Sequence, residues 1–271
     1  KNIAAARPRV IGFDIIFIGE SAHKENDELF RRVIADAGNV VLASYYTDIG
    51  EHVIPHAPFA EASRSYGLIN KPRDMDYRVR STRFFVEPKN EETKRLDYSF
   101  EAKVLCEYYG CPLEDMRYDG RSIRLKNKRA GAPDIAIPVA PDGIFTINYV
   151  ATDADFTVIP AWRIISGVFD KEELRDRIVL IGQTNEIIHD VYPTPLLDMP
   201  GVLINANAIL TVLTGRYVKE LPPLVNSLMI MLFTALAIGL TYRYAPLKGF
   251  CCIILEIAVF LGLSAWAFSS G

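Results

Sequence analysis

Two long apolar stretches near the carboxyl end constrain the fold of this chain most strongly. "LVNSLMIMLFTALAIGLTY" (224–242) has no charged residue, and "GFCCIILEIAVFLGLSAWAFSS" (249–270) is interrupted only by Glu256. As helices, both are long enough to cross the roughly 30 Å hydrocarbon layer of a bilayer. Soluble helices of this length usually carry a polar face, which these stretches lack. We therefore predict two transmembrane helices, at about 223–243 and 249–270.

The short segment between the two stretches predicts their orientation. "RYAPLKG" contains Arg243 and Lys248 and no acidic residue. Short loops rich in Lys and Arg face the cytoplasm, so we expect an extracytoplasmic domain over 1–220 and a transmembrane region over 221–271. The first ten residues, "KNIAAARPRV", have neither the apolar core nor the cleavage pattern of a signal peptide. We expect the segment that directs export to lie outside this sequence.

Residues 1–220 show the pattern of an α/β domain. Continuous apolar runs at 9–17, 39–44 and 177–182 are typical of buried parallel strands. A helical pattern over 25–38 joins the first two strands as a βαβ unit, and 122–140 alternates about a turn-rich centre as a hairpin does. We predict an α/β fold with a mostly parallel sheet, helices on both faces and an inserted β-hairpin, followed by two transmembrane α-helices.

Several local features refine this prediction. We expect Asn26 to cap the helix that ends at Gly38, a further helix over 58–67, a short strand over 68–72, and a helix over 200–215. Cys106 and Cys111 lie at a helix end, where they are either two buried thiols or a disulfide. The formal net charge of −3 gives no basic surface for nucleic acid. We find no metal-ligand spacing and no glycine-rich phosphate loop, so we expect no metal and no cofactor.

Polar residues that follow the predicted strands are candidates for ligand binding. Thr184, His189 and Asp190 follow the strand over 177–182, and Asp14 and Glu20 lie in or beyond the first strand. Open α/β sheets bind small ligands beyond the carboxyl ends of parallel strands, so these side chains could face one crevice. The alternative is that His189 and Asp190 hydrogen-bond the loop itself, which two prolines stiffen.

The run "RDMDYRVR" (73–80) supplies two more candidates, Asp76 and Arg80, which could pair with a polar ligand in a cleft. The alternative is a solvated loop with exposed ion pairs, which contribute little to stability.

The last predicted helix of the domain and the second apolar stretch contain polar residues that need partners. Asn205 lies at the edge of the helix's apolar stripe, where an unpaired buried amide would cost about 1–3 kcal/mol, and we include it among the ligand candidates. Gly201 and Asn207 on the same helix are candidates for signal transmission toward the membrane. Glu256, near mid-bilayer, is a third candidate for signal transmission. An ionised carboxylate at that depth is energetically costly, so we expect this side chain to be protonated or to face another helix.

Two other function classes are alternatives for this sequence. One is an extracytoplasmic hydrolase centred on Ser21 in "GESAH" (19–23) or on His189. The nucleophile elbow needs a glycine two residues after the serine, where this chain has His23, so we assign no catalytic residue. The other is a dimerisation or spacer module without a ligand, in which Glu256 and the membrane helices hold the assembly together.

The order of these segments resembles the type-2 CHASE domain, an extracytoplasmic sensory module of bacterial receptors. The blocks that carry the resemblance span almost all of 8–220: "VIGFDIIF", "NDELF", "NVVLAS", the "D.D..VR" run, "SFEAKVL", "INYV" and "RIVLIGQT....HDVYPTPL....PGVLINANAI....GR". Two departures are Tyr77, where the family pattern usually has Gly, and Asn205, where it often has His.

The resemblance implies a non-enzymatic sensor in a bacterial inner or plasma membrane, with its domain periplasmic or extracellular. It implies that a first strand and a membrane helix precede this sequence. A third membrane helix and a cytoplasmic effector, such as an adenylate or guanylate cyclase or a kinase, would follow it. The expected partners are an unknown small-molecule or environmental signal, the lipid bilayer, the effector, and a second copy of the chain in a homodimer.

Overall fold

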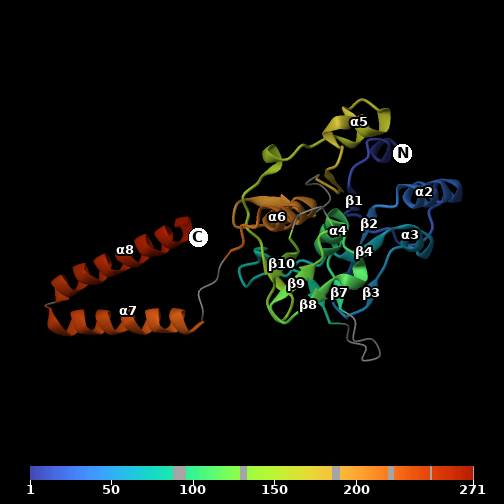
Figure 1. Ribbon diagram of the computed structural model, residues 1–271. Coiled ribbons are helices and arrows are strands. Elements are labelled where there is room, and N and C mark those ends of the chain that lie inside the picture. Colours follow the sequence, from blue (N-terminus) through green and yellow to red (C-terminus); the bar gives the residue numbers. More distant parts are fainter. Residues whose placement is uncertain (88–95, 129–132, 185–189, 219–222, 245, 271) are drawn as a thin grey trace. The chain divides into compact units, whose positions relative to one another are not determined.

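The computed structural model of the protein describes residues 1–271 except 88–95, 129–132, 185–189, 219–222, 245 and 271 (Figure 1). The chain divides into two compact units, Lys1–Tyr217 and Val218–Gly271.

The first unit is built on a five-stranded sheet. Its parallel strands lie in the order β12 (Ile178–Ile181), β1 (Val10–Phe13), β2 (Val40–Tyr46) and β4 (Ser65–Leu68), and β3 (His52–Val53) pairs antiparallel with β2. Val10 lies opposite Ile178, and Ile11 opposite Val40. A strand is therefore present within each of the apolar runs at 9–17, 39–44 and 177–182, although β1 ends at Phe13, four residues before the predicted end.

Helices pack on both faces of this sheet, as the alternation of strand side chains requires. Val10 and Val41 face the core that α4 (Phe100–Tyr109) and α6 (Gly201–Thr214) complete. Ile11 and Leu42 face the opposite core, which α2 (Lys24–Ala37) and α3 (Ala57–Ala62) cover. In that second core, Phe13, Phe17, Phe30 and Phe59 form edge-to-face and tilted pairs.

The remaining strands of the described residues form small antiparallel sheets. The predicted hairpin is present as β9 (Ser122–Leu125) and β10 (Ile135–Pro138), joined by β8 (Arg117–Tyr118). The other pairs are β5 (Ser81–Arg83) with β11 (Ile144–Thr146), β6 (Phe85–Val86) with β7 (Asp97–Tyr98), and β13 (Val191–Pro193) with β14 (Asp198–Pro200). A mostly parallel sheet is therefore not confirmed, and the fold is mixed α/β.

Short helices complete the first unit. The α-helical ones are α1 (Asn2–Ala5) and α5 (Ala161–Ser166), and the 3₁₀ turns are η1 (Leu113–Asp115), η2 (Asp153–Asp155) and η3 (Lys171–Glu173). Cys106 and Cys111 are buried free thiols, and Cys106 Sγ donates to the backbone oxygen of Cys111 at 3.1 Å. The sequence left open two buried thiols or a disulfide, and the structure has the two thiols.

Two further predicted boundaries are wrong. Helix α2 begins at Lys24 with His23 as its N-cap residue, so Asn26 lies inside the first turn, although the helix ends at Gly38 as predicted. Helix α3 ends at Ala62, and the next strand is β4, Ser65–Leu68, rather than 68–72. A Cβ added to Gly67 would lie 2.6 Å from backbone atoms of Ser99 and Phe100. The missing side chain lets β4 pack directly against the start of α4.

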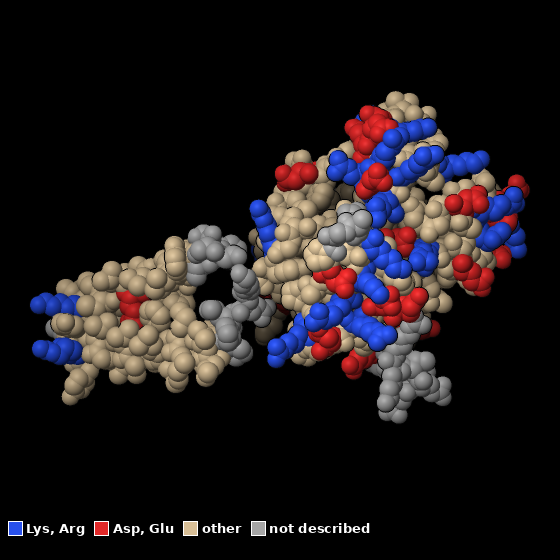
Figure 2. Space-filling view, viewed as in Figure 1, with Lys and Arg blue, Asp and Glu red and all other residues tan. Residues whose placement is uncertain are grey.

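The second unit consists of α7 (Pro223–Arg243) and α8 (Pro246–Ser270), both long and apolar enough to span a membrane. The two helices lie side by side, and Phe233 contacts Phe260 edge-to-face at 5.1 Å between ring centroids (Figure 1). In the space-filling view, basic side chains gather at one end of this unit and the rest is almost uncharged, in contrast to the mixed charges of the first unit (Figure 2).

We expect Gly67→Ala to lower the free energy of unfolding by about 1–3 kcal/mol, because the new methyl group would meet backbone that cannot move aside cheaply. The measurement is chemical denaturation of the detergent-solubilised chain followed by circular dichroism. Gly239→Ala is the control, since nothing lies within 4 Å of a Cβ at that helical position. Equal stability of Gly67→Ala and the wild type would contradict the close approach of β4 to α4.

Candidate functional site

Five polar side chains from separate segments meet at the carboxyl edge of the central sheet: Asp14, Lys71, Glu101, Asp190 and Asn205, here termed the polar cluster. Asp14 directly follows β1, Lys71 follows β4, and Asp190 precedes β13. Glu101 lies in the first turn of α4, and Asn205 lies on α6. The sheet and both helices of one layer therefore converge on one charged site.

A buried ion pair forms the centre of the polar cluster. Lys71 Nζ lies 3.2 Å from Glu101 Oε1, and the two side chains are 4% and 0% exposed. Thr82 Oγ1 donates to the same carboxylate oxygen at 3.0 Å. Ser99 fixes the helix that carries Glu101, because its hydroxyl accepts from the backbone N–H of Ala102 at 3.1 Å. Glu101 Oε2 is buried without a hydrogen-bond partner among the described residues.

Asn205 links α6 to two other segments of the polar cluster. Its Nδ2 donates to Asp14 Oδ2 at 3.0 Å, and its Oδ1 accepts a hydrogen bond from Lys71 Nζ. The side chain is completely buried. The expected need of this amide for partners is therefore met at both of its ends inside the domain.

The environment of Asp14 favours its protonated form. The pKa of Asp14 is raised to about 6, chiefly by burial and also by the neighbouring carboxylates of Asp190 and Glu101, against the opposing effects of Lys71 and the Asn205 amide. Burial also raises the pKa of Asp190, against the effects of its hydrogen bond with Tyr192 and the charge of Lys71. The site thus holds more carboxylates than it can neutralise with one lysine.

Gly201 allows Asp190 to approach the start of α6. The backbone N–H of Gly201 donates to the Asp190 carbonyl at 3.0 Å, and a Cβ on Gly201 would lie 2.9 Å from Asp190 Oδ2. Tyr192, which hydrogen-bonds Asp190, lies under the guanidinium of Arg73 at 5.2 Å from the ring centroid.

Asn207, the other asparagine of α6, binds a different segment. Its Nδ2 donates to the backbone oxygens of Ala151 and Leu203 at 2.9 and 3.0 Å, and its Oδ1 accepts from the N–H groups of Val150 and Ala151. Together, Asn205 and Asn207 connect α6 to the sheet edge and to the chain after β11. This places Gly201, Asn205 and Asn207 on one helix with three sets of partners.

Three of the predicted ligand residues form surface ion pairs outside the polar cluster. Glu20 pairs with Lys24 at 2.8 Å, and both side chains are more than half exposed. Arg80 pairs with Asp76 at 2.7 Å, with side chains 43% and 49% exposed, and these bonds lower the pKa of Asp76. These contacts match the alternative of a solvated loop with surface ion pairs.

The remaining predicted residues are placed as follows. Thr184 is exposed beyond the end of β12, and His189 lies outside the described residues. Ser21 Oγ accepts from the backbone N–H of His23 at 3.0 Å, and the N–H of Ser21 donates to Asp27 at 2.8 Å. Ser21 therefore belongs to the turn that leads into α2, as a surface-loop interpretation requires. In the second unit, both carboxylate oxygens of Glu256 are buried and have no hydrogen-bond partner among the described residues.

Sequence reasoning missed Lys71, Glu101 and Thr82. Lys71 lies in the segment 68–72, which was predicted to be a short strand, and Glu101 lies in the block "SFEAKVL". The available signal was the position of Glu101 between Phe100 and Ala102, because a charged residue amid a helix's apolar positions is seldom buried unless it has a partner.

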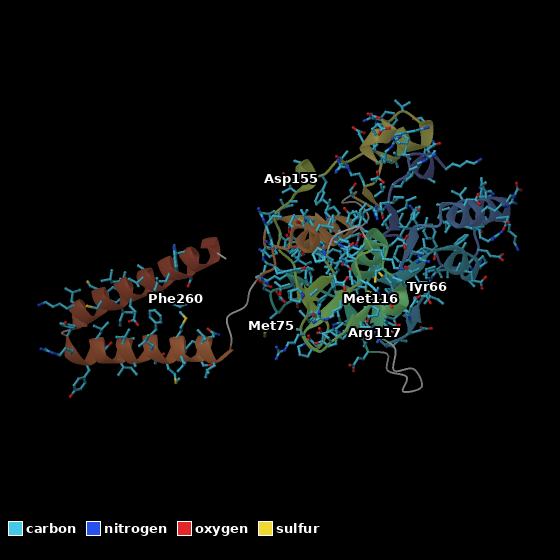
Figure 3. The ribbon with its side chains drawn as sticks, in the orientation of Figure 1. Tyr66, Met75, Met116, Arg117, Asp155 and Phe260 are labelled. Atoms are coloured by element: carbon cyan, nitrogen blue, oxygen red, sulfur yellow. The ribbon has the colours of Figure 1, made fainter. Side chains whose placement is uncertain are left out.

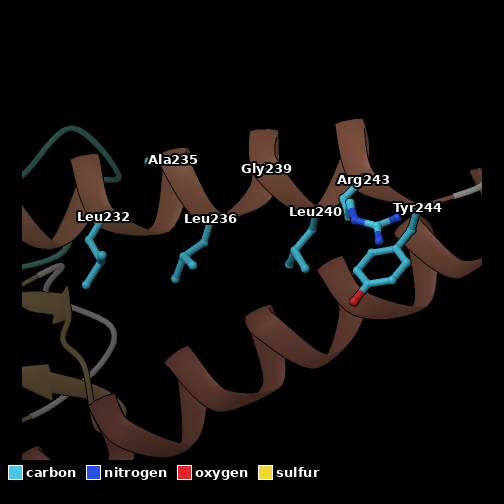
Figure 4. Close-up of a pocket in the computed structure, with 7 residues that line it drawn as sticks. All are labelled: Leu232, Ala235, Leu236, Gly239, Leu240, Arg243 and Tyr244. Carbon is cyan, nitrogen blue, oxygen red and sulfur yellow. The ribbon is translucent and has the colours of Figure 1, made fainter.

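Two hollows of the structure lie elsewhere. One, of about 390 Å³, runs along α7, where Leu232, Leu236 and Leu240 point to the same side one turn apart, with Arg243 and Tyr244 at its end (Figure 4). Its apolar lining suits lipid or another helix rather than a polar ligand. The other, of about 490 Å³, is a hollow of the first unit that includes Met116 and Arg117 (Figure 3). Neither includes a residue of the polar cluster.

We expect Lys71→Met to lower the free energy of unfolding by about 3–5 kcal/mol, because it leaves the Glu101 carboxylate buried without its cation. The double variant Lys71→Met with Glu101→Gln should recover much of the loss. Lys24→Met, which breaks an exposed ion pair, is the matched control and should change little. Denaturant titration of the detergent-solubilised chain measures all three, and equal losses for Lys71→Met and Lys24→Met would contradict a buried pair.

Comparison with known proteins gives one match. No curated protein and no solved structure matched the chain. The CHASE2 domain family matches over residues 1–240, which is most of the 271 residues. CHASE2 domains are extracytoplasmic sensor domains and are not catalytic. Because this match covers well over half of the sequence, the chain belongs to the CHASE2 domain family.

Proposed function

We propose that residues 1–217 are the extracytoplasmic input domain of a bacterial transmembrane receptor, and that α7 and α8 carry its response toward a cytoplasmic effector. The effector would be a nucleotide cyclase or a kinase, and the receptor would act as a homodimer in the bilayer. The observation that carries the proposal is the position of α6. It takes part in the polar cluster through Asn205, and its chain continues from Thr214 to the start of α7 at Pro223.

The contacts of α6 suit a transmitting element. Directional hydrogen bonds from Asn205 and Asn207 fix the seating of the helix more narrowly than apolar packing alone would. A signal that alters the polar cluster changes the partners of Asn205, and therefore the favoured position of α6. Helix shifts of this kind are a common form of switching in proteins.

The proposed orientation can be tested by cysteine labelling in intact bacterial cells. In a background with Cys251 and Cys252 replaced by alanine, we expect a membrane-impermeant maleimide to label Met75→Cys, since Met75 is fully exposed on the first unit (Figure 3). Tyr242→Cys, at the end of α7 next to the basic loop, should react only after permeabilisation. Cys106 and Cys111 are buried and should not react with the maleimide. The reverse labelling pattern would overturn the orientation.

Coupling between the polar cluster and the membrane helices can be measured with an environment-sensitive fluorophore on Tyr242→Cys, in the full chain in nanodiscs. We expect Asn205→Leu, which removes the bonds to Asp14 and Lys71, to shift the emission. Asn26→Ala, an exposed site on α2, is the control and should leave the emission unchanged. Identical spectra for the two variants, with helix content preserved, would contradict transmission through α6.

A further inference from the structure

We propose that the signal read by the polar cluster is the proton: Asp14 gains a proton when the extracytoplasmic medium becomes mildly acidic, and this changes how firmly α6 is held. This inference rests on the proposed function and names the regulation of the same site. It depends on the burial of the cluster, on its excess of carboxylates, and on the direct bond between Asp14 and α6.

Asp14 combines partial exposure to solvent with a hydrogen bond between its carboxylate and a side chain of α6. It is partly exposed at the end of β1, whereas Glu101 and Asn205 are completely buried. Its Oδ2 accepts the hydrogen bond from Asn205, whose other end is held by Lys71. A proton that arrives from water at Asp14 therefore acts on a bond made by α6.

The charges that face Asp14 come from each segment packed around it. Lys71 lies on the segment after β4, Glu101 on α4 and Asp190 before β13, and the charge of Asp14 also acts on Tyr192 of β13. When Asp14 is ionised, three carboxylates share the charge of Lys71. Protonation of Asp14 removes one negative charge, which relieves its repulsion with Asp190 beside the start of α6. The raised pKa of Asp14, about 6, puts this change in the mildly acidic range.

The sign of the response follows from linkage. Because the pKa of Asp14 is about 6 in the folded protein against 3.8 as its ordinary value, the folded state binds the proton more tightly than the unfolded chain does. The stabilisation is complete below about pH 4 and is lost as the pH rises through about 6. Acidification should therefore stabilise the folded domain against unfolding, and exchange of the α6 amides, which are released when the domain unfolds, should slow with it.

The test is hydrogen–deuterium exchange of α6 in the full chain in nanodiscs, at about pH 5 and about pH 7.5, corrected for intrinsic exchange rates. We expect exchange in wild-type α6 to slow by about threefold or more at the lower pH. Asp14→Asn, a neutral side chain of the same shape, should exchange slowly at both pH values. Glu61→Gln, an exposed carboxylate on α3, is the matched control and should behave as the wild type does.

Two results would overturn the inference. One is pH-independent exchange of wild-type α6. The other is an unchanged pH response in Asp14→Asn, which would assign the response to another group such as His52. If Asp14→Asn folds poorly, the test is a pH titration of the ¹³C chemical shift of the Asp14 carboxyl group in the wild type. A titration midpoint below about pH 4.5 would refute the inference. The labelling of Met75→Cys and the fluorescence emission at Tyr242→Cys do not depend on these results. The proposed function can therefore stand even if the proton is not the signal.

Discussion

The buried ion pair of Lys71 and Glu101 fixes the geometry on which the rest of the site depends. Taking both charges out of water is costly, and the pair is tolerated because Thr82 and Asn205 supply further hydrogen bonds to its two ends. These bonds join the end of β4, the start of α4 and the middle of α6. The position of Asp14 against α6 is therefore set by a network that cannot relax one member at a time.

Helix α6 differs from an ordinary covering helix of an α/β layer in what it buries. Asn205, Asn207 and Thr211 are all essentially inaccessible to solvent, and each bonds to a segment distant in sequence. Apolar packing tolerates small slides, whereas buried amides lose a hydrogen bond when they move. The helix is thus limited to a few positions against the rest of the domain. A transmitting element that switches between two states needs this property.

Local patterns in the sequence predicted the elements but not the centre of the site. Apolar runs determine strands such as 177–182, and length with composition determines α7 and α8, so these could be predicted without knowing the fold. Lys71 and Glu101 are thirty positions apart, and the packing of β4 at Gly67 against the start of α4 helps to bring them together. Asp76 and Arg80 had the more suggestive spacing, yet they satisfy each other at the surface.

Asn205 shows how a departure from the family pattern can keep the chemistry of a site. It stands where the resemblance to type-2 CHASE domains leads one to expect histidine. A neutral imidazole donates through one nitrogen and accepts through the other, and the Asn205 amide does the same toward Asp14 and Lys71. The amide, however, keeps its charge state at every pH. In this chain the link to α6 is therefore constant in charge, and any response of the link to acid must come from the carboxylate it binds.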